Sequence, residues 1–144
     1  MDQKMKAREL LFRIEMVRKG AIQPSWNEMG LIAGQPRVLS ELLEKDRMSQ
    51  VELAQACFIE PATLSRALDK LESAGYLSRR QNPKSRRSFL ICLTAKGKEA
   101  AERVREMFRL SEDRMFESFT EEELDCLIRL MGKVYINLFH EEES

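Results

Sequence analysis

Positively charged side chains gather in one short stretch of the sequence. Between residues 79 and 98 there are seven Lys or Arg and no Asp or Glu, although the whole chain has a formal net charge of zero. Such a concentration is typical of phosphate contact, because each cation neutralises a phosphate and releases its counterions. A solvated charged face is the alternative interpretation. The candidate phosphate-binding residues of this stretch are Arg79, Arg80, Lys84, Arg86 and Arg87.

The segment before the basic stretch is predicted to be a helix with one apolar and one polar side. Pro61 suits the first position of a helix, and Gly75 suits the left-handed residue that follows its end. Three leucines at helical spacing, beginning with Leu64, predict the buried side. The other side carries residues that are small or able to donate hydrogen bonds to base edges and phosphates. The candidates are Pro61, Ala62, Thr63, Ser65, Arg66 and Lys70.

The neighbouring elements would hold this polar side in place. Ser49 and Glu52 form a capping-box pattern, which predicts the start of a short helix that ends before Pro61. The basic stretch contains two extended segments around Asn82-Pro83, a pattern typical of a β-hairpin. Two helices joined by a turn and followed by a hairpin are the order of a winged helix-turn-helix, in which the second helix is the recognition helix.

Several motifs in this order resemble the MarR family of winged helix-turn-helix regulators. They are Gly34-Gln35-Pro36-Arg37-Val38-Leu39, residues 50–54, residues 59–66, Gly75-Tyr76-Leu77 with Arg79-Arg80, and Leu93-Thr94-Ala95-Lys96-Gly97. The resemblance covers nearly the whole chain and adds Arg37 and Gln50 to the candidate DNA contacts. It implies a homodimer, double-stranded DNA with a palindromic operator as the partner, and often a small aromatic or phenolic effector. We therefore expect a sequence-specific transcriptional regulator, most often a repressor in this family.

The hairpin, called the wing, departs from the family pattern. The family usually has Asp-x-x-Asp-x-Arg there, with the second Asp steadying an Arg that enters the minor groove. This chain has Asn82, Ser85 and Arg87 at those positions, so the Arg is kept and both acids are replaced. Ser85 remains a candidate hydrogen-bond acceptor for Arg87. The resemblance thus implies a wing that is more positive and less rigid than is usual.

The remaining sequence predicts further helices and one domain. Helices are expected from Met5 to about Gly20, from Gly34 to about Lys45, from Thr94 to about Phe119, and from Thr120 onward, with a connector at residues 22–26. We expect a mainly α fold in a single domain, residues 1–144. Residues 35–98 would form the winged helix-turn-helix head, and residues 1–20 and 99–144 would form N- and C-terminal dimerisation helices.

The terminal helices carry more apolar residues than a small head requires. They either bury one another within one chain or pair with a second chain, and their surplus of Phe, Leu and Met favours a homodimer. Residues 99–144 hold thirteen acidic and six basic side chains, so we expect this end to face away from DNA.

An effector would fit a crevice between the dimerisation helices and the head. The candidate apolar lining comprises Leu11, Ile14, Trp26, Met29, Leu31, Ile32 and Met107, with Arg13 or Arg18 available to an acid group. The alternative is that these side chains are simply core and dimer interface.

Other functional classes find little support in the sequence. His140 is the only histidine, and no Gly-rich phosphate loop is present, so we expect no catalytic residues, no metal and no cofactor. The charged start and the lack of a long apolar run favour a cytoplasmic protein without membrane contact. Apolar neighbours of the three cysteines, Cys57, Cys92 and Cys126, predict buried structural thiols. Two alternatives remain: a regulator that senses oxidants through these cysteines, and a winged-helix protein-interaction module without DNA binding.

Overall fold

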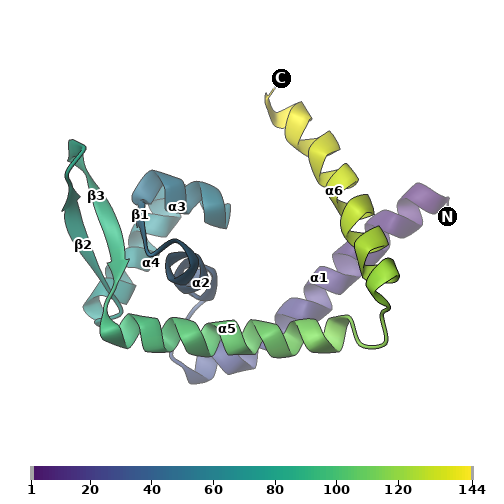
Figure 1. Ribbon diagram of the computed structural model, residues 1–144, viewed down its shortest axis with the longest axis horizontal. Coiled ribbons are helices and arrows are strands. Elements are labelled where there is room, and N and C mark those ends of the chain that lie inside the picture. The colour runs from purple at the N-terminus through teal and green to yellow at the C-terminus, as the bar shows by residue number, and fades with distance from the viewer. Residues whose placement is uncertain (1, 144) are drawn as a thin grey trace. The chain divides into compact units, whose positions relative to one another are not determined.

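The computed structural model describes residues 2–143, and the side chains of residues 2–139. Its elements are α1 (Gln3–Glu28), α2 (Gln35–Lys45), β1 (Arg47–Ser49), α3 (Gln50–Cys57), α4 (Pro61–Ser73), β2 (Leu77–Asn82), β3 (Ser85–Leu93), α5 (Ala95–Met115) and α6 (Glu121–Glu143) (Figure 1). The chain forms two compact units, with the boundary between Arg109 and Leu110. The first unit contains the helix-turn-helix and the wing, and the second contains α6. The mainly helical winged fold expected from the sequence is confirmed.

The sheet is small and antiparallel, with strand order β1-β3-β2. The hairpin β2–β3 was predicted, whereas β1 was not. Met48, the middle residue of β1, lies opposite Ile91 of β3, and both side chains are buried. The strand β1 therefore ties the start of α3 to the wing.

The core of the first unit is built from leucines of the helix-turn-helix and one side of the sheet. Leu39 and Leu42 of α2, Leu53 of α3 and Leu64 and Leu68 of α4 are fully buried. Ile91 joins them from the sheet, and Ala101 and Val104 join them from α5. Burial of a leucine stabilises a fold by about 1.5–3 kcal/mol, so this cluster holds α4 in a fixed orientation.

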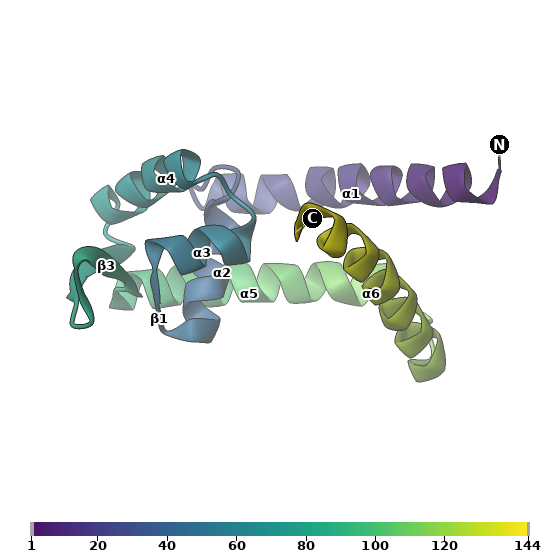
Figure 2. The same ribbon diagram turned by 90° about the horizontal axis from the view of Figure 1, so that it is seen from above.

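Helix α1 is longer than the sequence predicted. It continues through Gly20 and Pro24 to Glu28, so the predicted helix end at Gly20 and the predicted connector at residues 22–26 were wrong (Figure 2). A glycine costs a helix about 1 kcal/mol relative to alanine, and Pro24, which removes one hydrogen bond and crowds the carbonyl of Gly20, costs about 3 kcal/mol, so other contacts must offset both. Burial of Ile22 in this segment favours continuation of the helix.

Helix α5 begins where predicted and ends earlier. The Thr94 hydroxyl accepts a hydrogen bond from the N–H of Gly97 at 3.0 Å. The helix stops at Met115 and not near Phe119, because Ser118 adopts a left-handed conformation with φ of 68°. Helix α6 begins at the predicted place, where Thr120 and Glu123 form a capping box with both reciprocal hydrogen bonds at 3.1 Å.

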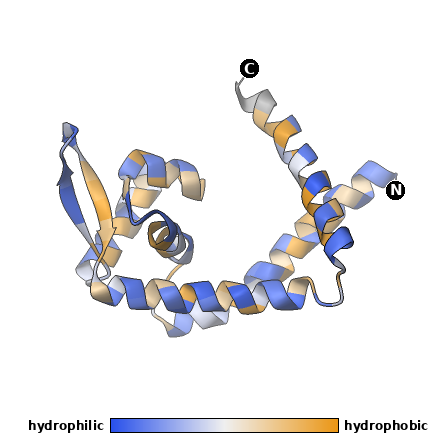
Figure 3. Cartoon of the chain, in the orientation of Figure 1, coloured by the Kyte–Doolittle hydropathy of each residue, from blue (hydrophilic) through white to orange (hydrophobic). Residues whose placement is uncertain are grey.

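Apolar side chains on the terminal helices are exposed in the single chain. On α1, Leu11 and Val17 are 53% and 72% exposed, and on α6, Val134 and Leu138 are 47% and 59% exposed. Figure 3 shows apolar residues recurring along both helices. The described helices include none that is long and apolar enough to span a membrane.

Candidate nucleic-acid interface

Helix α4 presents a polar side to the solvent. Leu64, Leu68 and Leu71 are buried as the spacing predicted, and Ala67 beside them is only 8% exposed. The opposite side exposes Pro61, Ala62, Thr63, Arg66 and Lys70, with Ser65 half-buried. Among the described residues Arg66 has no ion-pair partner, so its guanidinium is available for a hydrogen-bond acceptor. The helix-turn-helix interpretation of α4 is thus supported by its burial pattern.

The turn before α4 is set by α3. Ser49 caps α3 by accepting a hydrogen bond from the N–H of Glu52 at 3.2 Å, and its hydroxyl donates to the Glu52 carboxylate at 3.0 Å. The helix ends at Phe58, which adopts a left-handed conformation with φ of 53°, and the N–H of Ile59 then bonds the carbonyl of Ala54. Gln50, a candidate DNA contact, lies half-buried at the start of α3.

The wing turns at Pro83-Lys84 and is irregular just after that turn. Gln81 lies opposite Phe89, whereas the next residue, Asn82, lies opposite Ser85. Residues 86–88 therefore form a bulge in β3, which bends the strand and changes the direction of its side chains. The side chain of Asn82 closes this loop, because its Oδ1 accepts from the N–H of Lys84 at 3.0 Å and its Nδ2 donates to the Ser88 hydroxyl at 3.1 Å. Asn82, and not Ser85, is thus the residue that orders the wing tip.

Four wing cations are exposed to solvent. They are Arg80, Lys84, Arg86 and Arg87. No ion pair joins any of them to the residues that the structure describes. Arg86 and Arg87 lie in the bulge, so the irregular segment carries the highest density of unpaired positive charge.

Two of the candidate DNA contacts are instead engaged by carboxylates. Arg79 pairs with Asp69 and Glu72 of α4, each at 3.0 Å, and its side chain is only 18% exposed. Arg37 pairs with Glu41 at 2.9 Å on α2. The sequence indicated their charge but not these partners.

A junction around Lys96 fixes the end of α4 to the start of α5. Lys96 donates a hydrogen bond to the carbonyl of Ala74 at 2.7 Å, and its Nζ lies 4.8 Å from the centre of the Tyr76 ring. A lysine ammonium at a helix C-terminus stabilises the last carbonyl groups. Lys96 therefore serves the fold, although it contributes to the basic stretch.

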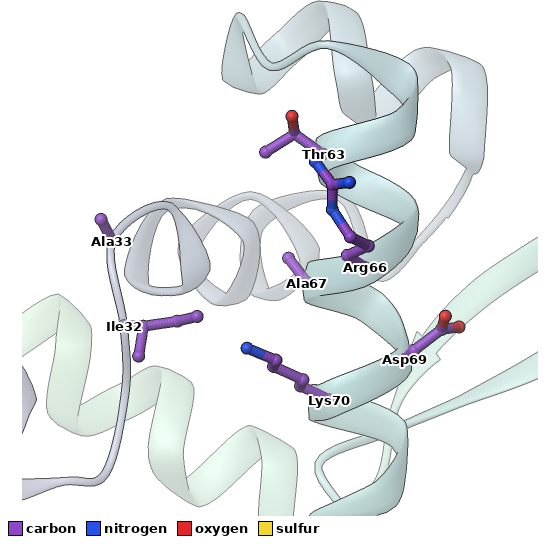
Figure 4. A pocket seen from close by; sticks show the side chains of 7 residues that line it. All are labelled: Ile32, Ala33, Thr63, Arg66, Ala67, Asp69 and Lys70. Atoms are coloured by element: carbon purple, nitrogen blue, oxygen red, sulfur yellow. The ribbon is translucent and has the colours of Figure 1, made fainter.

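A cavity of about 370 Å³ lies beside the exposed side of α4. Figure 4 shows Ile32 and Ala33, from the segment before α2, across from Thr63, Arg66, Ala67 and Lys70 of α4, whereas the side chain of Asp69, which also lines the cavity, points away from Ile32. This hollow is part of the surface that carries the candidate DNA contacts.

The candidate effector residues do not line this cavity, apart from Ile32. Leu11 and Ile14 are exposed on α1, whereas Trp26, Met29 and Met107 pack against the core of the first unit and Leu31 belongs to it. Arg18 is paired with Glu15 at 2.8 Å, which raises the pKa of Arg18, and Arg13 is paired with Glu9. The structure thus divides the candidate lining between core and surface.

The cysteines differ in their surroundings. Burial, followed by the charge of Glu41, raises the pKa of the Cys57 thiol to about 11. Cys92 is partly buried, whereas Cys126 is exposed on α6, so the prediction of a buried thiol was wrong for Cys126. No group of side chains in the described part of the chain has the composition and spacing of a metal site, and the side chain of His140 lies outside that part.

Comparison with known proteins identifies the family. The MarR family profile matches residues 31–89, which span the head from the segment before α2 into β3. A crystal structure of a MarR-family transcriptional regulator from Silicibacter pomeroyi is 30% identical, covers 91% of this chain and 88% of its own, and superposes with a TM-score of 0.81. The chain belongs to the MarR family. Members are DNA-binding transcriptional regulators and not enzymes, which confirms the predicted class.

Two further relatives match the chain. The HTH-type transcriptional regulator BilQ of Clostridium symbiosum is 32% identical over 91 residues, which are 63% of this chain and 63% of that protein. A mutant of MarR from E. coli, in complex with operator DNA, superposes with a TM-score of 0.79 at 22% identity and covers 93% of this chain and 99% of its own. At that identity the second likeness concerns the fold alone.

Proposed function

We propose that this MarR-family chain is a sequence-specific repressor that binds a palindromic operator as a homodimer. The observation that carries the proposal is the set of exposed cations in the wing together with the exposed Arg66 of α4. Exposed cations in the wing suit phosphates or the minor groove, and Arg66 and its hydroxyl neighbours suit the major groove.

The dimer is supported by the terminal helices. Exposed leucine, isoleucine, valine and aromatic residues on α1 and α6 are costly in water, and a second copy of the chain would cover them. A two-fold axis would present two copies of α4 to half-sites about one helical turn apart. Palindromic binding follows from that symmetry.

Response to a small aromatic or phenolic ligand is the second part of the proposal. It rests on the family, in which such effectors are frequent, and on the partial burial of Trp26, Met29 and Met107 beside the head. A ligand releases DNA only if it binds the DNA-free state more tightly. Titration with benzoate, followed by Trp26 fluorescence and operator affinity together, tests this part; benzoate binding that changes neither signal would contradict this placement.

The alternative functions have weaker support. The raised pKa of Cys57 keeps its thiol protonated near neutral pH, which disfavours oxidant sensing at that residue. A protein-interaction module would have no need for four exposed, unpaired wing cations.

A binding selection tests the main proposal. Duplexes recovered from a random pool by the purified chain are compared with scrambled duplexes of the same composition, at increasing salt, and the mass of the chain in solution is measured in parallel. We expect a dimer, a palindromic consensus, and affinity that falls steeply with salt. A monomer, or salt-dependent binding without sequence preference, would contradict the proposal.

A further inference from the structure

Arg79 differs from every other cation of the wing. Its Nη1 atom lies 3.0 Å from Oε1 of Glu72, and its Nη2 atom lies 3.0 Å from Oδ1 of Asp69. The side chain of Arg79 is 18% exposed, whereas those of Asp69 and Glu72 are 67% and 44% exposed. The guanidinium is therefore the least accessible part of this cluster.

The two ion pairs connect the elements that are expected to contact DNA. Asp69 and Glu72 lie one turn apart on α4, and Arg79 lies on β2 opposite Ile91, which is fully buried in the sheet. A planar guanidinium with two separate N–H contacts restrains direction as well as distance, which a single ammonium does not. The pairs therefore restrain the wing relative to α4.

The same pairs change the local charge. Without Arg79, two carboxylates would stand unpaired at the edge of a surface that must approach phosphates. Such uncompensated charges would repel DNA of any sequence.

We propose that Arg79 is a positioning residue, which fixes the wing to α4 through Asp69 and Glu72 and does not contact phosphate. This inference rests on the proposed DNA-binding function. Arg79 is then a determinant of sequence specificity. The contacts of α4 with bases and those of the wing with the DNA backbone must form at the same time, which requires a fixed position of the wing relative to α4.

The test compares Arg79→Gln with Arg80→Gln, which removes an exposed and unpaired neighbour. Affinity for the selected duplex and for its scrambled counterpart is measured over a range of salt concentrations. We expect Arg79→Gln to weaken binding to both duplexes through the two uncompensated carboxylates and, unlike Arg80→Gln, to lower the ratio of specific to non-specific affinity about tenfold, because coupled networks respond by such factors. Arg80→Gln is expected to weaken both duplexes alike and to reduce the slope of log affinity against log salt by about 1 per monomer.

A second variant breaks the same contacts from the other side. Asp69→Asn with Glu72→Gln retains Arg79, and we expect the same loss of the specificity ratio, with Arg79→Lys intermediate. The inference is overturned if Arg79→Gln behaves like Arg80→Gln, or if the double variant retains the wild-type ratio. If the wild-type chain binds neither duplex, the proposed function fails instead, so the two failures are distinct.

Discussion

Gly97, in the first turn of α5, lies directly against the backbone carbonyl of Tyr76, which follows α4. A Cβ atom at Gly97 would sit 1.7 Å from that carbonyl oxygen. At the same junction the Thr94 hydroxyl donates to the carbonyl of Gly75 at 2.6 Å, and Lys96 donates to that of Ala74. Helix α5 is thus held against the residues that end α4, and a side chain at Gly97 would separate them.

Gly97→Ala is expected to lower the free energy of unfolding by at least about 2 kcal/mol, because overpacking against backbone has no flexible side chain to relieve it. Gly20→Ala is the matched control, since a Cβ there meets no atom within 4 Å outside its own helix backbone. Because alanine is the better helix former, the control should be neutral or more stable by up to about 1 kcal/mol. Urea unfolding of both variants measures the difference, and equal stability of the two would refute the role of Gly97.

The helix-turn-helix could be predicted because its signals are local. Caps such as Ser49, the first-turn Pro61 and the leucine spacing of α4 act within a few residues, and the structure contains each of them. The three-residue strand β1 could not be predicted, since it depends on pairing with β3 more than forty residues away in sequence.

The sequence predicts which residues of the candidate interface are charged, but not which of them form ion pairs. The sequence indicates equal charge for Arg79 and Arg80, yet only Arg79 meets the carboxylates of α4, because successive residues of a strand face opposite sides. The spacing of Asp69 and Glu72 places both carboxylates on one side of α4. This spacing indicates a partner for Arg79 only once β2 is known to lie beside α4. Similarly, the continuation of α1 depends on burial of Ile22, which is a tertiary contact. The nearby Gly20 and Pro24, which usually end helices, led to the prediction of a shorter helix.

Cys57 is expected to react slowly with iodoacetamide at pH 8. Burial raises its pKa from 9.0 to about 11, so the reactive thiolate is scarce until the pH approaches 11. In single-cysteine variants, with the other two changed to Ser, exposed Cys126 should be alkylated first. The raised pKa of Cys57 also makes the free energy of unfolding depend on pH. It stabilises the folded state below about pH 9, and this contribution is lost as the pH rises toward 11. Rapid alkylation of native Cys57 at pH 8 would restore the oxidant-sensing alternative.

Arg66→Ala is expected to reduce affinity for the selected operator by about 1–3 kcal/mol if the guanidinium reads a base edge. Affinity for the scrambled duplex should change less, because a base contact carries sequence information. Arg8→Ala, an exposed cation on α1, is the control and should retain the wild-type preference. Mobility shifts measure both duplexes, with circular dichroism to verify the fold. Unchanged operator affinity in folded Arg66→Ala would remove Arg66 from the interface.

The double variant Arg86→Gln and Arg87→Gln tests the bulge of the wing. Both cations are exposed, and neither forms an ion pair with the described residues, so each is free to neutralise one phosphate. We expect the slope of log affinity against log salt to fall by about 2 per monomer. Lys4→Gln with Lys6→Gln removes the same charge from α1, outside the proposed interface, and should leave the slope nearly unchanged. If both double variants lower the slope equally, net charge and not wing contact governs binding. If Arg87 lies in a narrow minor groove, the wild-type chain should favour AT-rich flanks, because such grooves concentrate negative potential; the double variant should lose this preference, and restoring Arg87 alone should return it.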